Sequence, residues 1–133
     1  MDINNKVAFI TGGSGGLGSV IALRLAASGA NIAISYGQNL AAAKEIETQI
    51  IAMGRKCCIL KMDQRDPQSI INSVNHIVSE LGAVDILVNN AAANPYFGHI
   101  LETDLKAFQK TVDVNIRGYF FMSSQGAKLM KAN

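Results

Sequence analysis

A glycine-rich segment near the amino terminus, Thr11–Gly18, has the spacing needed to bind phosphate groups. It reads TGGSGGLG, and it lies between a short apolar run and a helical pattern. Glycines permit positive φ angles and let backbone approach a ligand closely, while a helix N-terminus offers free N–H groups and a positive dipole end. The segment therefore predicts a phosphate cradle. No Gly-Lys-Ser/Thr follows it, which excludes a P-loop.

Two glycine patterns share these letters: GxGxxG at Gly13, Gly15 and Gly18, and TGxxxGxG at Gly12, Gly16 and Gly18. The usual companion of GxGxxG is an acid about 20 residues later, at the end of the second strand. That place holds Ser35-Tyr36-Gly37, which contains no acid. A flexible glycine turn without a ligand is the alternative interpretation of this segment.

Four short apolar runs are expected to position these residues as strands. They are rich in Val, Ile and Leu without alternation, which indicates strands buried on both faces of a parallel sheet. The predicted strands are Lys6–Thr11, Asn31–Tyr36, Lys56–Met62 and Asp85–Asn89.

Helical patterns fill the intervals between these strands. The predicted helices are Leu17 to Leu25, ending at Gly29; Leu40 to Met53, ending at Gly54; Ile70 to Leu81; and about Thr103 to Met130. The third has Asp66 as its N-cap, Pro67 at its first position and Gly82 at its end. The β-α-β-α-β-α-β-loop-α order predicts an α/β fold with a doubly wound, Rossmann-like parallel sheet.

A further stretch, Asn89-Asn90-Ala91-Ala92, directly follows the fourth predicted strand. TGxxxGxG after strand one with an NNAG-like stretch after strand four resembles the short-chain dehydrogenase/reductase family. Asp63 before Asp66 resembles the family's D-x-x-D stretch, and Asn115 resembles the asparagine of its long fourth helix. The resemblance covers Lys6 to Met130. Within it, NAAxNPxFG at residues 90–98 is similar to a subgroup of NADPH-preferring carbonyl and retinal reductases.

The resemblance implies a role for each matching position in a dinucleotide site. Pyrophosphate contacts are expected from Gly12, Ser14, Gly16, Leu17 and Gly18. The ribose and nicotinamide are expected along Asn89, Ala91 and Ala92, with Asn89 also tying the central strands together. Asn115 is the catalytic candidate, because the family's asparagine holds a proton relay from the catalytic lysine through a helix kink and a water.

The adenosine half of the cofactor is expected beside the second and third strands. Asp63 would accept a hydrogen bond from the adenine amino group, since a carboxylate suits an exocyclic N–H₂, and Gln64 would lie beside the adenine. Tyr36 stands where an acid would repel a 2′-phosphate, and Gly37 where the family often has an NADP-type arginine. We expect Tyr36 to contact the cofactor and NADP(H) to be favoured, with NAD(H) as the alternative.

The family's chemistry also needs a serine and a Tyr-x-x-x-Lys pair, and none of Tyr36, Tyr96 and Tyr119 has a lysine four residues later. The resemblance implies that these catalytic residues lie beyond position 133. We therefore expect residues 1–133 to form one incomplete dinucleotide-binding domain, the N-terminal part of the fold with strand order 3-2-1-4. By itself this part should be inactive.

The function implied for the complete protein is NAD(P)-dependent hydride transfer between the nicotinamide and a small carbonyl or secondary alcohol substrate. One alternative is a 3-oxoacyl thioester reductase, and another is a non-catalytic dinucleotide-binding module. Because the long helix packs at a subunit contact in the family, a homo-oligomer, either a dimer or a tetramer, is also expected.

The amino-acid composition excludes several other classes of protein. Over 133 residues, 49% are apolar and 17% charged, which fits one domain with a core and argues against disorder. The net charge of +2 is scattered, so no nucleic-acid partner is predicted. No apolar stretch approaches the ~18–20 residues of a membrane span, and the start lacks a signal-peptide pattern, so a cytoplasmic protein is expected. Cys57 and Cys58 are adjacent and predict neither a disulfide nor a metal site.

Overall fold

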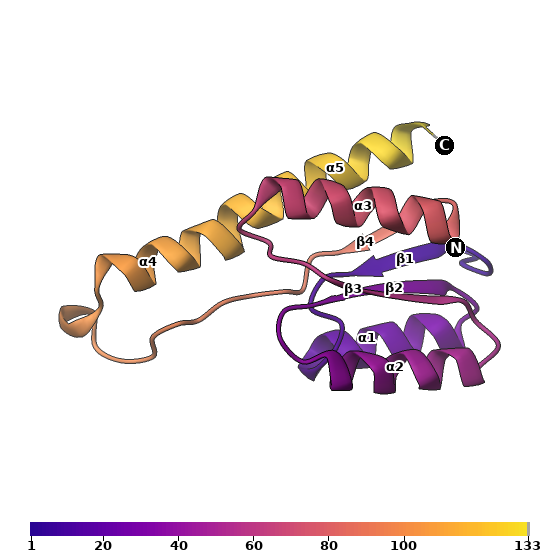
Figure 1. The fold of residues 1–133 in the computed structure, drawn as a ribbon, viewed down its shortest axis with the longest axis horizontal. Coiled ribbons are helices and arrows are strands. Elements are labelled where there is room, and N and C mark those ends of the chain that lie inside the picture. Colours follow the sequence, from indigo (N-terminus) through magenta and orange to yellow (C-terminus); the bar gives the residue numbers. More distant parts are fainter. Residues whose placement is uncertain (133) are drawn as a thin grey trace.

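The computed structural model describes residues 1–132 and consists of one four-stranded parallel sheet with helices on both faces (Figure 1). The strands are β1 (Val7–Ile10), β2 (Asn31–Tyr36), β3 (Cys57–Lys61) and β4 (Ile86–Val88). The helices are α1 (Gly16–Ala27), α2 (Leu40–Ala52), α3 (Pro67–Leu81), the 3₁₀ turn η1 (Ile100–Glu102), α4 (Leu105–Val112), the π-helical segment η2 (Asp113–Gly118) and α5 (Tyr119–Ala132).

The strand order is β3-β2-β1-β4, which confirms the predicted Rossmann-like fold. Every pairing is parallel, with Phe9 opposite both Ala33 of β2 and Leu87 of β4. Helices α1 and α2 cover one face of the sheet, while α3 and α5 cover the other (Figure 1). Central β1 is fully buried, because apolar helices pack against both of its faces.

The structure trims three of the predicted strands at both ends, because the flanking residues turn away from the regular ladder. These flanking residues still make individual backbone hydrogen bonds to a neighbouring strand. The Thr11 N–H donates to Val88 O at 3.0 Å, and the Asp85 N–H donates to Val7 O at 2.9 Å. Residues adjoining the strand ends therefore remain fixed to neighbouring strands. This matters because the candidate site lies at one of these ends.

The helix boundaries follow the predicted capping residues. The Asp66 carboxylate accepts a hydrogen bond from the Gln68 N–H at 2.9 Å, and Pro67 occupies the first turn of α3. Gly82 closes α3 with φ of +88°, a left-handed conformation that favours glycine.

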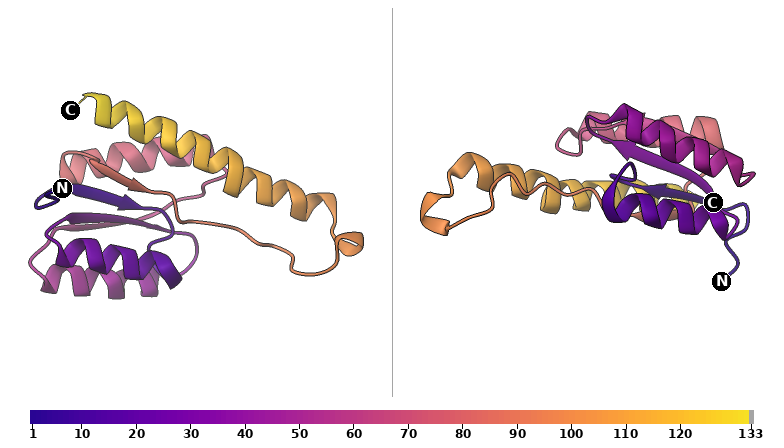
Figure 2. Two further views of the ribbon diagram at one scale, coloured as in Figure 1. Left: turned by 180° about the vertical axis from the view of Figure 1, so that it is seen from behind. Right: turned by 90° about the horizontal axis from the view of Figure 1, so that it is seen from below.

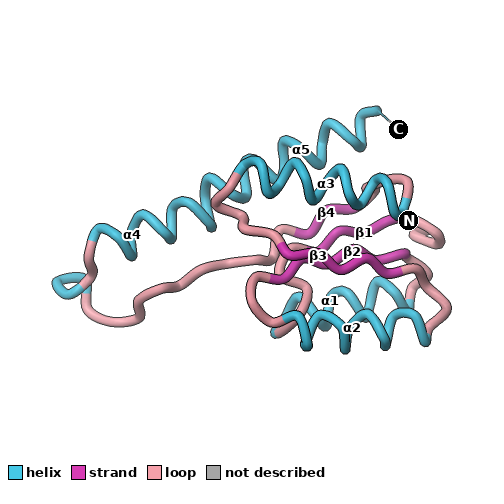
Figure 3. Tube along the Cα trace, in the orientation of Figure 1, coloured by secondary structure: helices cyan, strands magenta, loops and turns pink. Residues whose placement is uncertain are grey.

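The long last helix differs from the prediction of one regular helix from about Thr103 to Met130. The helix is continuous in the trace (Figure 3). Between α4 and α5, however, η2 forms a π-helical turn. The 3.6-residue periodicity gives no warning of this turn, because a π turn adds its extra residue locally while the apolar face resumes beyond it.

The segment from Asn89 to His99 leaves the sheet and leads to η1 and α4, which project beyond the sheet layers (Figure 2). Large apolar side chains on this projection face solvent, among them Phe97, Leu105 and Phe108. Within residues 1–132, no helix is long and apolar enough to cross a membrane.

Candidate functional site

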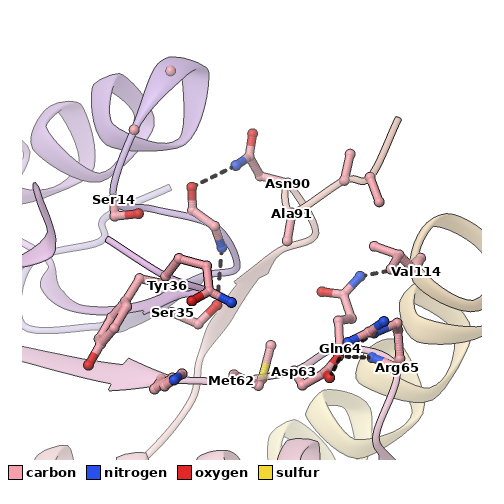
Figure 4. A pocket seen from close by; sticks show the side chains of 18 of the residues that line it. Ser14, Ser35, Tyr36, Met62, Asp63, Gln64, Arg65, Asn90, Ala91 and Val114 are labelled. Atoms are coloured by element: carbon pink, nitrogen blue, oxygen red, sulfur yellow. Dashed lines mark hydrogen bonds and ion pairs between the residues drawn. The ribbon is translucent and has the colours of Figure 1, made fainter. Parts of the chain in front are cut away.

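A cavity of about 800 Å³ lies at the carboxyl ends of the strands, where open α/β sheets bind their ligands. Its walls come from the loop after β1, the ends of β2 and β3, the segment after β4, and the long helix at Lys110 and Val114. Figure 4 shows Ser14 and Tyr36 on one side of it and Asp63, Gln64 and Arg65 on the other. The fold therefore brings five segments that are distant in sequence around one space.

The loop after β1 is folded as an anion cradle. Gly12 and Gly16 have φ of +65° and +52°, and α1 begins at Gly16 without an acidic residue in its first turn. A Cβ built on Gly15 or Gly16 would meet no atom within 4 Å, and both glycines line the cavity. Bare backbone at a helix N-terminus thus faces the open space, which suits a pyrophosphate.

The other glycines of the loop are required by close packing. A Cβ on Gly12 would lie 2.9 Å from the Cα of Ala91, and one on Gly18 would overlap Gly12 O and Asn90 Nδ2. The loop is also tied to β2, because the Gly12 N–H donates to Ser35 Oγ at 3.1 Å and the Gly13 N–H to Ser35 O at 3.0 Å. Its shape is therefore fixed by the protein.

Strands β1 and β4 are joined at the site by Thr11 and Asn90, which lie just past their ends. The buried Thr11 hydroxyl accepts hydrogen bonds from the Asn90 and Ala91 N–H groups, both at 3.0 Å. The Asn90 side-chain amide donates to Thr11 O at 3.0 Å and Gly12 O at 3.1 Å. These hydrogen bonds hold the segment after β4 against the glycine-rich loop after β1.

This arrangement corrects the role expected for Asn89. Its amide donates to Ser123 Oγ of α5 at 2.9 Å, so Asn89 joins the end of β4 to a helix instead of tying the central strands. Successive residues leaving a strand point in opposite directions, and here Asn90 is the one directed toward β1. The Asn89 Oδ1 is buried and has no hydrogen-bond partner within residues 1–132.

The expected adenine side is built from the three residues after Met62. Asp63 is held by Arg65 through two side-chain bonds, Nε to Oδ1 at 3.0 Å and an NH2 to Oδ2 at 2.8 Å. The hydrogen bond from Arg65 lowers the pKa of the Asp63 carboxyl, which remains half exposed at the cavity wall. Gln64 lines the cavity but donates its amide to Val114 O at 2.9 Å, as Figure 4 shows.

Asn115 lies in the π-helical segment, one layer behind the cavity wall. Its Oδ1 accepts from the Ala93 N–H and its Nδ2 donates to Ala93 O, both at 2.8 Å. Ala93 lines the cavity, and Asn115 does not. The asparagine amide therefore fixes the backbone of the segment after β4 on the side away from Thr11.

Most of the predicted contact residues lie at the cavity. Those in its lining are Gly12, Ser14, Gly16, Tyr36, Asp63, Gln64, Ala91 and Ala92. Those outside it are Leu17, Gly18, Asn89 and Asn115. Leu17 is 68% exposed on the outer side of α1, whereas Gly18, Asn89 and Asn115 support the wall from behind.

Sequence reasoning missed the cations of the site. Lys61, Arg65 and Lys110 line the cavity, while Asp63 is the single acidic residue in the lining described for residues 1–132. Lys61 carried a usable signal, since the last residue of a parallel strand reaches the same sheet edge as its neighbours. No group of three His, Cys, Asp or Glu side chains that could hold a metal ion occurs in the described chain.

A glycine cradle at a helix N-terminus on this sheet defines a dinucleotide-binding α/β protein. The sequence profile described as short chain dehydrogenase matches residues 6–133. The chain belongs to the short-chain dehydrogenase/reductase family, as its motifs predicted.

Relatives and solved structures agree with this assignment. The chain is 38% identical over 133 residues to L-rhamnose 1-dehydrogenase (NADP(+)) of Thermoplasma acidophilum, matching 100% of this chain and 52% of that protein. It is 33% identical over 123 residues to hydroxynaphthalene reductase arp2 of Aspergillus fumigatus, matching 92% of this chain and 45% of that protein.

The fold superposes closely on two structures solved with cofactor. A short chain dehydrogenase from Burkholderia cenocepacia in complex with NADP gives a TM-score of 0.93 at 35% identity, covering 98% of this chain and 53% of that one. A blue fluorescent protein from a metagenomic library in complex with NADPH gives 0.91 at 35% identity, with the same two coverages. The chain thus spans about half the length of the proteins it matches.

Proposed function

We propose that the complete protein is an NADP(H)-dependent oxidoreductase that transfers a hydride between the nicotinamide and a carbonyl or secondary alcohol. The open glycine cradle at the start of α1 is the observation that carries this proposal. The lack of an acid at Tyr36 supports NADP(H) over NAD(H), because no carboxylate there repels a 2′-phosphate. The NADP and NADPH named for three similar proteins support the same choice.

The residues of this chain would bind and orient the cofactor. Backbone at Gly16 and the side chain of Ser14 would hold the pyrophosphate. Asp63 would accept from the adenine amino group with the acceptor site on Oδ2 that the three hydrogen bonds from Arg65 leave free. Ala91 and Ala92 would border the ribose and nicotinamide on a backbone fixed from both sides. A bound nicotinamide dinucleotide supplies the hydride chemistry.

We assign Asn115 a positioning role in this reaction. Both polar atoms of its side chain are engaged by Ala93, so it holds the nicotinamide side of the cavity in place. The proton for the substrate oxygen is proposed to come from a Tyr-x-x-x-Lys pair, which does not occur among these 133 residues.

The complete protein is further proposed to be a cytoplasmic homo-oligomer. Exposed apolar side chains along α4 and the following helix, including Phe108 and Phe120, favour a subunit contact there. The free Cys57 and Cys58 suit a reducing compartment.

The test is cofactor binding and turnover by the full-length protein. Calorimetric titration should give tighter binding of NADPH than of NADH. NADPH oxidation is then followed with aldoses, simple ketones, aromatic ketones and a 3-oxoacyl thioester. Turnover confined to the thioester would favour the 3-oxoacyl thioester reductase, and binding without any turnover would favour a non-catalytic module. Failure to bind either dinucleotide would refute the proposal.

A further inference from the structure

Lys61 lines the cavity but has no role in the function proposed above. It is the last residue of β3, and its register partner on β2 is Tyr36. Tyr36 and the β3 residues Cys57 and Ile59 pack against the cluster on the α1/α2 face of the sheet. Because side chains alternate along a strand, Lys61 lies on that same face, beside Tyr36 at the carboxyl edge.

The charge of Lys61 has no counterion in the part of the chain described. Two ion pairs occur in residues 1–132, Asp63 with Arg65 and Asp113 with Arg117. Asp63, the acid in the cavity lining, already forms a bidentate ion pair with Arg65, so the positive charge of Arg65 is largely balanced. Lys61 is exposed at the cavity and leaves this end of β2 and β3 with an uncompensated positive charge.

The start of α2 adds to this positive field. Gly37 and Gln38 line the cavity just before α2, whose first turn contains no acidic residue. The Asn39 side chain caps the helix by accepting from the Ala42 N–H at 3.0 Å. A Cβ on Gly37 would meet no atom within 4 Å, so there is room for a ligand group beside this turn. The end of the second strand is also where a dinucleotide places its adenosine ribose.

We propose that Lys61 is the specificity-determining residue for NADP(H), binding the 2′-phosphate of the adenosine ribose from the end of β3. The proposal rests on the proposed function and adds the residue that recognises the phosphate. It accounts for a site with neither an acid at Tyr36 nor an arginine at Gly37, because the cation comes from the neighbouring strand. Lysine acts here as a point charge, which suits a phosphate group.

The test compares two lysines at opposite ends of β3 in the full-length protein. Lys61→Met removes the charge at the cavity, and Lys56→Met removes an exposed lysine just before the strand, at its amino end. Dissociation constants are measured by calorimetry for NADPH, NADH, 2′,5′-ADP and 5′-ADP. Lys61→Met should weaken NADPH and 2′,5′-ADP by about ten- to hundredfold and change NADH and 5′-ADP less than about twofold. Lys56→Met should change none of the four.

Two further results make the interpretation specific. Lys61→Arg should retain most of the affinity for 2′,5′-ADP, and added salt should weaken 2′,5′-ADP binding more in the wild type than in Lys61→Met. Equal loss of NADPH and NADH in Lys61→Met, or no loss of either, would overturn the assignment while leaving the proposed function intact. Wild-type protein that prefers NADH would overturn it as well. Wild-type protein that binds neither dinucleotide would instead refute the proposed function.

Discussion

Gly16 illustrates how one residue can be required for a ligand without being required for packing. A Cβ built at this position would meet no atom of another segment within 4 Å, so packing against those segments does not require glycine there. What the position needs is its φ of +52° and the bare surface that it presents to the cavity. Both are properties that glycine provides and a branched residue does not.

Gly16→Val should raise the dissociation constant for NADPH at least about tenfold in the full-length protein, because the branched side chain occupies the phosphate space. Gly54→Val is the matched control. Gly54 has φ of +77° and equally open surroundings but lies in the turn after α2, outside the cavity lining. Both variants should lose about 1–2 kcal/mol of stability from the same backbone strain. Unchanged NADPH affinity in Gly16→Val would contradict the assignment of the loop.

The burial of the adjacent cysteines should make their thiols slow to react with alkylating reagents. Burial, assisted by the charge of Glu47, raises the pKa of Cys57 to about 12, and burial with the charge of Glu80 raises that of Cys58 to about 11. At pH 8 both thiols should therefore resist iodoacetamide in the folded protein and react rapidly in denaturant, as followed by mass spectrometry. Rapid alkylation of the native protein would show that the strand is less buried than the structure has it.

The same pKa shifts predict a loss of stability at high pH. Below the ordinary thiol pKa of 9.0, folded and unfolded chains both hold these protons and the stability is fully present. Between about 9 and the folded values of about 11 and 12, the unfolded chain ionises first, so the free energy of unfolding falls as pH rises. Denaturant melts at pH 8 and pH 10 should show this fall, and a Cys57→Ala/Cys58→Ala variant should reduce it.

At residue scale, the sequence predicted the cradle but not its full surroundings. Gly12 and Gly16 could be found because strand, glycines and helix follow one another along the chain. The position of Lys61 near a strand end could place it at the carboxyl edge of the sheet, but its neighbour Tyr36 could not be found from the sequence, since strand register is a tertiary property. Asn90, and not the predicted Asn89, contacts the end of β1 for a similar reason. Neighbouring residues along an extended chain point in opposite directions, so an error of one residue reverses the direction of the side chain.

At the scale of elements, the π-helical segment η2 joins the site to the long helix. Gln64 donates to Val114 O, and Arg117 donates to Arg65 O at 2.8 Å, so the loop after β3 is anchored to η2. A Cβ on Gly118 would lie 2.6 Å from Gln64 Cγ, which shows how closely the two segments approach. The sequence predicted the helix but not this turn, whose extra residue is fixed by contacts distant in sequence.

Asn115→Leu should disrupt the site through the segment after β4. The change removes both bonds to Ala93 and leaves its part-buried N–H and C=O without their partner, at a cost of about 1–3 kcal/mol each. We expect faster hydrogen exchange at the Ala93 amide, weaker NADPH binding and a larger fall in kcat. Gln109→Leu, which removes an exposed bond to Asp113 in the same long helix, is the control and should change none of these. Unchanged exchange at Ala93 would show that other contacts hold the segment.

At the scale of the whole molecule, this chain exposes one strand edge and one apolar helix face. Strand β4 pairs with β1 on one side and forms the edge of the four-stranded sheet on the other. Along α4 and the first turn of α5, Leu105, Phe108 and Phe120 are 85%, 59% and 74% exposed. An exposed apolar helix face and an unpaired strand edge each favour association with other chains.

We therefore expect the 133-residue chain, produced by itself, to self-associate and to catalyse no NADPH-dependent carbonyl reduction. Light scattering after size exclusion should give a mass well above the 14.2 kDa monomer, rising with concentration. Phe108→Glu/Phe120→Glu should lower that mass, because the charges make burial of the helix face costly. Ile51→Glu, at an exposed site 57% accessible on α2, is the control and should leave the mass unchanged. A monomeric wild-type chain with a cooperative melt would show that neither the β4 edge nor the helix face drives association. Measurable carbonyl reduction would show that the proton donor is not the Tyr-x-x-x-Lys pair.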